Sequence, residues 1–180
     1  MISLIQRNAE QLRELNEAIH RTYRARSLSK TNAAAWSDAC EAFHSSYDRL
    51  AFPGGLTRAY DMLRKRDAAI LEPVIAFLEA DPYFFRSGYI KADLVKALSK
   101  FPLDQRQRTR LQQVIVARVK GPPRREFRKY CNLAPRVTAP EFEDDLDRLA
   151  GSSDPVTGRQ AKWVLEALRR SREKSQGDAA

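Results

Sequence analysis

Apolar residues recur at steps of three and four along most of this chain, and this spacing sharply limits the folds open to it. Two stripes are clear in the first third: Ile5, Leu12, Leu15, Ile19 and Tyr23, then Trp36, Cys40, Phe43, Tyr47 and Leu50. Such spacing places apolar side chains on one side of an α-helix, and no strand-like alternation is longer than four residues. The chain is therefore predicted to be all-α, with about eight helices in antiparallel hairpins joined by short connections.

Proline and glycine mark the ends of several predicted helices. Phe52-Pro53-Gly54-Gly55 closes the second helix, and Gly121-Pro122-Pro123 breaks the chain again. Further helices are expected over residues 56–66, 68–80, 82–100, 104–120, 124–133, 140–149 and 155–170. A chain of 180 residues suits one domain, which we expect over residues 1–172. Residues 173–180 lack large apolar side chains and are expected to form a flexible tail.

Two segments share the pattern Asp-Pro-x-x-x-Arg. They are Asp81-Pro82-Tyr83-Phe84-Phe85-Arg86 and Asp154-Pro155-Val156-Thr157-Gly158-Arg159. In each, Asp is the expected N-cap of a helix and Pro occupies its first turn. The pattern resembles the HEAT and armadillo-like repeats, which are antiparallel helix pairs with Asp-Pro at the turn and Arg on the second helix. The resemblance covers about 25 residues in each copy and implies a short HEAT-like array.

Positive charge is concentrated in the middle of the chain. Residues 86–136 carry fourteen Lys and Arg against three acids, whereas the other 129 residues carry eighteen against twenty. The net charge of +9 therefore arises from this stretch. A surface with an excess of one sign attracts phosphates or acidic proteins.

The candidate binding residues form two groups within this stretch. Spacing by four places Arg106 and Arg110 on one side of their predicted helix. The second group flanks the Gly-Pro-Pro break: Lys120, Arg124, Arg125, Arg128 and Lys129. An ordinary solvated helix face is the alternative interpretation, although such a face usually intersperses both signs.

An acidic run follows the basic stretch: Glu141, Glu143, Asp144, Asp145 and Asp147. Acids suit the first turn of a helix, because the helix dipole is positive there. The run is also able to pair with the basic stretch across a hairpin, which would partly neutralise the proposed face.

Aromatic residues lie beside the basic stretch: Tyr83, Phe84, Phe85 and Tyr89. An exposed aromatic can stack on an unpaired base. Phe85 and Tyr89 lie four apart on a predicted helix, so packing in the core is the preferred interpretation. Trp36 and Trp163 lie on apolar stripes and are expected to be buried.

No pattern in the sequence indicates catalysis or metal binding. Cys40 and His44 share one side of a helix, but a zinc site needs two more ligands, and His20 and Cys131 have no recognised spacing. The Cys–His pair also lacks a third group and an oxyanion-binding loop. Some HEAT-like proteins are DNA glycosylases, but no aromatic pocket or catalytic Asp is placed here. We expect no enzymatic activity and no cofactor or metal.

The composition favours a cytoplasmic protein. Two cysteines make no disulfide framework, which suits a reducing compartment. No apolar run approaches the ~20 residues of a membrane span. Residues 1–14 lack the apolar core of a signal peptide. We expect no membrane association.

These features favour a non-enzymatic binding module that recognises an acidic macromolecular partner. An acidic protein is preferred, as for an adaptor or a toxin-immunity protein, because helical arrays present extended surfaces. The alternative is nucleic-acid binding through the basic face of residues 86–136, and assembly through the first helix is a third interpretation. A groove lined by Arg and Lys would favour nucleic acid, whereas an apolar patch ringed by Arg would favour a protein.

Overall fold

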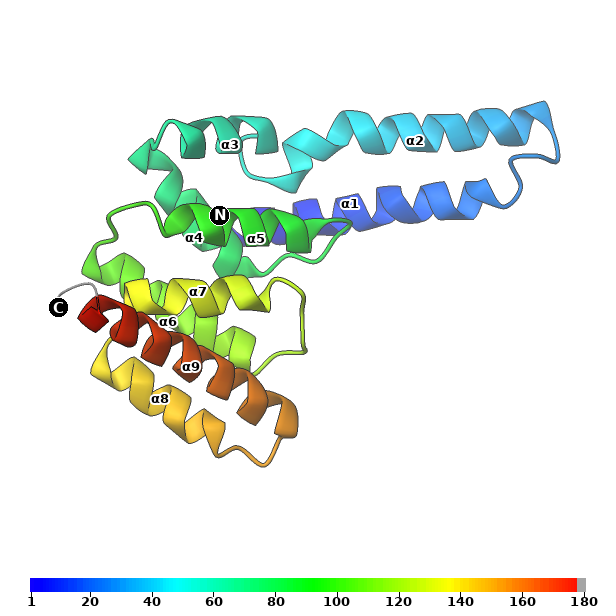
Figure 1. The fold of residues 1–180 in the computed structure, drawn as a ribbon. Coiled ribbons are helices and arrows are strands. Elements are labelled where there is room, and N and C mark those ends of the chain that lie inside the picture. The colour runs from blue at the N-terminus through cyan, green and yellow to red at the C-terminus, as the bar shows by residue number, and fades with distance from the viewer. Residues whose placement is uncertain (178–180) are drawn as a thin grey trace. The chain divides into compact units, whose positions relative to one another are not determined.

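The computed structural model describes residues 1–177, and its regular structure within them is all helical (Figure 1). The elements are α1 (Ile2–Tyr23), α2 (Lys30–Ala51), α3 (Leu56–Arg64), the 3-10 helix η1 (Ala68–Ile70), α4 (Leu71–Ala80), α5 (Ser87–Leu98), α6 (Gln105–Val119), α7 (Phe127–Val137), α8 (Pro140–Ala150) and α9 (Pro155–Gly177). The prediction of an all-α fold built from helical hairpins is confirmed, with nine α-helices in the described range where about eight were expected.

Contacts within the chain group it into two compact units, Met1–Ser87 and Gly88–Ala180. The expectation of one domain over residues 1–172 stays a prediction. Helix α9 runs to Gly177 and so includes residues 173–177 of the expected tail. Residues 178–180 lie outside the described range.

The first unit contains a long antiparallel hairpin of α1 and α2 (Figure 1). The start of α2 is fixed locally, since the Ser29 side chain caps this helix by accepting a hydrogen bond from the Asn32 amide at 3.1 Å. Helix α1 also packs on α4, whose residues are mostly buried. Between Arg13 and Ala42 no residue is buried, so the distal half of the hairpin lies outside the core of this unit.

The two Asp-Pro segments have different local structures. Asp154 caps α9 as expected, accepting hydrogen bonds from the Val156 and Thr157 amides at 3.2 and 3.0 Å. Asp81 instead ends α4 in the left-handed conformation, at φ 45° and ψ 51°. The expected helix start at Asp81 is therefore wrong, and α5 begins at Ser87. The following proline disfavours right-handed helix at Asp81, and Asp tolerates the left-handed region. Membership of the HEAT-like repeats stays a prediction.

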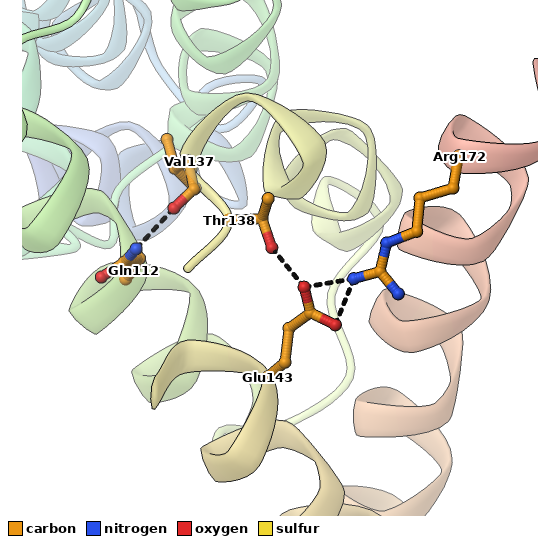
Figure 2. A network of polar contacts seen from close by, with 5 residues as sticks. All are labelled: Gln112, Val137, Thr138, Glu143 and Arg172. Atoms are coloured by element: carbon orange, nitrogen blue, oxygen red, sulfur yellow. Dashed lines mark hydrogen bonds and ion pairs between the residues drawn. The ribbon is translucent and has the colours of Figure 1, made fainter. Parts of the chain in front are cut away.

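In the second unit, α8 and α9 form an antiparallel pair, and α7 packs against both α6 and α9. Figure 2 shows how polar contacts tie these helices together. Glu143 of α8 accepts hydrogen bonds from Arg172 of α9 and, at 2.8 Å, from the Thr138 hydroxyl. The Gln112 side chain of α6 donates to the Val137 carbonyl at the end of α7. Glu143 of the acidic run thus pairs with α9, outside the basic stretch.

Several aromatic residues expected in the core are exposed. Phe84 is buried, but Tyr83, Phe85 and Tyr89 are each about half exposed or more. Phe85 and Tyr89 were expected to share a helix face, yet Phe85 precedes α5 and lies in the connection after α4. Trp163 is also exposed, at 39% of its surface, so the expectation that it is buried is wrong.

Candidate functional site

Helix α7 presents a cationic face to solvent. Its inner side is apolar, with Phe127, Tyr130, Cys131, Leu133, Ala134 and Val137 buried. Its exposed residues are Arg128, Lys129, Asn132 and Arg136. Three of these four carry positive charge and none is acidic, because the short helix uses its apolar residues for packing and leaves its basic residues outside.

Helix α9 carries a matching row of side chains beside α7. Trp163, Glu166, Arg170 and Lys174 follow one another at steps of three and four, so they lie along one side of the helix. The two helices pack against each other. Residues far apart in the sequence therefore line one surface.

A groove of about 850 Å³ lies between α7 and α9. Its charged lining residues are Arg128 and Arg136 from α7 with Glu166, Arg170 and Lys174 from α9. The other lining residues include Cys131, Asn132, Pro135, Trp163 and Ala167. We call this the basic groove. Four cations and one acid line it, so its local potential is positive.

The cations of the basic groove are largely available to a ligand. Glu166 lies 3.6 Å from the Arg170 guanidinium, and both groups are about half exposed. Within residues 1–177, Arg128, Arg136 and Lys174 have no ion-pair partner. A solvated face that served only solubility would pair such charges with interspersed acids.

Cys131 lies at the floor of the basic groove as a neutral thiol. Burial raises its pKa to about 11, and the neighbouring Arg128 and Arg170 only partly offset this effect. A thiol with this pKa is protonated at neutral pH, and the thiolate is the reactive form. The raised pKa therefore gives no sign of an activated nucleophile at Cys131.

Trp163 marks one end of the basic groove. Its ring packs at 6.2 Å from the buried Phe127 ring, centroid to centroid, and the Arg159 guanidinium lies 5.7 Å from the Trp163 ring. A second hollow, of about 450 Å³, lies against Trp163 near the α8–α9 turn and is lined by Arg159 and Lys162. The exposed indole thus lies where two cation-lined hollows meet.

Buried polar contacts hold the loop between α6 and α7. The buried Gln160 side chain donates hydrogen bonds to the Val119 and Gly121 carbonyls at 3.0 and 2.9 Å. Glu126, at the start of α7, lies 3.4 Å from the Lys91 ammonium, and both side chains are almost fully buried. A Cβ added at Gly88 would lie 3.0 Å from the Glu126 carboxylate, so glycine leaves room for this pair. These contacts therefore fix the α6–α7 loop to α9 at one end and to α5 at the other.

Of the residues predicted from sequence, Arg128 alone lines the basic groove. Lys129 is exposed on α7 and Lys120 is exposed at the end of α6. Arg125 and the half-buried Arg124 lie in the loop before α7, and the Arg125 guanidinium stacks 4.2 Å from the Tyr89 ring centroid.

The α6 candidates do not join this cluster. Arg106 is exposed in the first turn of α6 and Arg110 is half-buried, and neither lines the basic groove. Their predicted common side is therefore not part of the basic groove.

Arg136, Trp163, Arg170 and Lys174 were missed as site residues. Two signals in the sequence point to them. Arg128, Asn132 and Arg136 step by four along α7, and the α9 row steps by three and four. The pairing of α7 with α9 is a tertiary contact, which neither spacing reveals alone.

Comparison with known proteins gives no assignment: no family model, curated protein or solved structure matches this chain significantly. Within the described residues, no helix is long and apolar enough to cross a membrane. No group of three or more metal-ligating side chains is found in the same range. The candidate functional site of this chain is therefore the basic groove.

Proposed function

We propose that this protein is a non-enzymatic binding module that recognises an acidic macromolecular partner through the basic groove. The observation that carries the proposal is the set of cations lining this groove, three of which have no ion-pair partner in the described part of the chain. Unpaired cations on a hollowed surface focus a positive potential and attract polyanions.

The scaffold around the groove supports this role. Buried apolar residues fix α7, the Glu143–Arg172 pair ties α8 to α9, and Gln160 holds the end of α6. Binding residues positioned on packed helices lose less conformational freedom when a ligand arrives than residues on loops.

Retention on immobilised heparin, used as a generic polyanion, tests the proposal. The groove variant replaces Arg128, Arg136 and Lys174 with Gln. The matched control replaces Arg7, Arg58 and Lys65, three exposed cations of the first unit, and removes the same charge. We expect the groove variant to elute at clearly lower salt than the control. It makes fewer contacts with the polyanion, so its binding releases fewer counterions.

Equal elution of the two variants would overturn the proposal, because overall charge would then account for retention. Circular dichroism of both variants provides the check on folding. All six substituted side chains are exposed, so both proteins should keep the helical spectrum of the parent.

A further inference from the structure

Trp163 combines exposure with a fixed position. A large aromatic side chain left 39% exposed forgoes part of the free energy that full burial would supply. Its ring is nevertheless held by the buried Phe127 ring at 6.2 Å, within the range of favourable aromatic pairs. A held ring with an open surface is preorganised to receive a flat partner, because little side-chain freedom remains to be lost.

Cations flank this ring on both sides. Arg128 and Arg170 lie in the basic groove, and Arg159 and Lys162 lie in the second hollow. A bound polymer that stacks one flat group on Trp163 would place the groups on either side of it in these two hollows. The cations suit phosphates on either side of a stacked base, which is how single-stranded nucleic acid combines stacking with backbone contacts.

The apolar area of the groove is small for a protein partner. Beyond Trp163, its apolar lining comes mainly from Pro135 and Ala167 and from the buried Cys131. Stable protein interfaces have an apolar core with several large anchors surrounded by a polar rim. The groove instead offers one large aromatic anchor, Trp163, together with four cations.

We propose that the basic groove binds single-stranded nucleic acid, with one unpaired base stacked on Trp163 and the adjacent phosphates on the cations of the two hollows. This inference rests on the proposed function and names its partner class. A duplex keeps its bases stacked on one another, so it lacks the exposed face that Trp163 would contact.

The test compares two oligonucleotides of about 12 positions. One is oligo-thymidine, and the other has the same phosphates but abasic sugars at every position. Trp163→Ala should weaken oligo-thymidine binding at least about fivefold, the lower end of the cost of losing one stacked base. It should leave binding of the abasic strand unchanged. Trp163→Phe keeps an aromatic face and should retain most of the affinity.

Fluorescence supplies a second readout. The sequence has two tryptophans, so Trp36→Phe leaves Trp163 as the only one. Oligo-thymidine should quench this emission to saturation, and the abasic strand should quench it much less. A stability effect of Trp163→Ala would lower binding of both strands, and thermal melts would reveal it independently.

The outcomes separate the two proposals. If the groove variant loses oligo-thymidine binding but Trp163→Ala and the quenching show no base dependence, the inference is wrong and the groove remains a polyanion site. If an acidic polyglutamate peptide binds and both oligonucleotides fail, the partner is a protein and the inference is again overturned. If no polyanion depends on the groove cations, the proposed function itself fails.

Discussion

Trp36 lies in the α1–α2 hairpin and Trp163 lies beside the basic groove, and each has an arginine near its ring. The Arg26 guanidinium lies 5.8 Å from the Trp36 ring, and Arg159 lies 5.7 Å from that of Trp163. Their surroundings differ. Trp36 is half-buried against the exposed Tyr23, and its buried indole nitrogen has no hydrogen-bond partner in the described structure.

The side-chain contacts that stabilise the α1–α2 hairpin also differ from those around the basic groove. Side-chain hydrogen bonds and ion pairs within the hairpin helices are mostly local, such as Glu10 with Arg13 and Glu17 with Arg21. Around the groove, buried Lys91, Glu126 and Gln160 join separate elements. Similar ring-and-arginine pairs thus occur in the distal half of the hairpin, where no residue is buried, and on a braced surface. Residues on a braced surface keep their positions better, which is what a binding site requires.

Hydrogen exchange should show the largest contrast. Amides between Arg13 and Ala42, where no residue is buried, should open at free energies at least about 3 kcal/mol below those of α7. Native-state exchange measured residue by residue checks this. Equal protection in both regions would mean that the hairpin is stabilised by something other than burial.

Breaking the buried ion pair should cause the next largest effect. Lys91→Met leaves the Glu126 carboxylate buried without its cation, and a loss of about 3–5 kcal/mol in unfolding free energy is expected from urea titrations. The matched exposed pair is Asp61 with Arg64, where Arg64→Met should cost less than about 1 kcal/mol. Similar losses at the two pairs would mean that burial does not set the cost of breaking an ion pair in this protein.

The tryptophans should tolerate truncation better than fully buried ones. Trp36→Ala and Trp163→Ala are each expected to cost about 1–2 kcal/mol, below the 3–5 kcal/mol typical of core positions, because both rings are partly exposed. Trp36→Phe should cost less than Trp163→Phe, since it also removes a buried unpaired N–H group. Chemical denaturation of the four variants measures this order, which a loss above about 3 kcal/mol at either site would contradict.

The smallest effect concerns pH. Arg172 lowers the pKa of Glu143 from its usual 4.5, with a further contribution from the Thr138 hydroxyl. Because the folded pKa is the lower one, this contact stabilises the folded state above the unfolded pKa and is lost as pH falls through the folded pKa. Glu143→Gln should therefore lower the melting temperature slightly at pH 7 and converge with the parent at about pH 2. A constant difference across this range would point to packing instead of charge.

The helical periodicity was sufficient to predict the all-α fold, because apolar stripes depend only on local spacing. It failed at Asp81, where the favoured N-cap residue types also suit a left-handed helix end. Whether Asp81 begins a helix or ends one depends on where the buried residues of α4 end, and α4 continues to Ala80. Local reasoning likewise placed Phe85 and Trp163 in the core, because it assumed that every apolar stripe meets a partner.

Charge counting along the sequence pointed to α7 but to only one of the four cations that line the basic groove. It identified Arg128 because α7 lies in the basic stretch, and it passed over Arg170 and Lys174 because acids elsewhere balance the last third of the chain. Those acids lie mainly on α8, and Glu143 faces Arg172. Net charge along a sequence therefore hides a cationic face when opposite charges fold onto neighbouring helices.

The most direct test of the central claim observes both tryptophans at once. A proton–nitrogen NMR spectrum contains one indole signal from each tryptophan, and Trp36→Phe assigns them. On titration with oligo-thymidine, the Trp163 indole signal and the amides of α7 and α9 should shift together, while the Trp36 signal stays in place. A shift of the Trp36 signal with Trp163 unmoved would contradict the account and place binding on the hairpin.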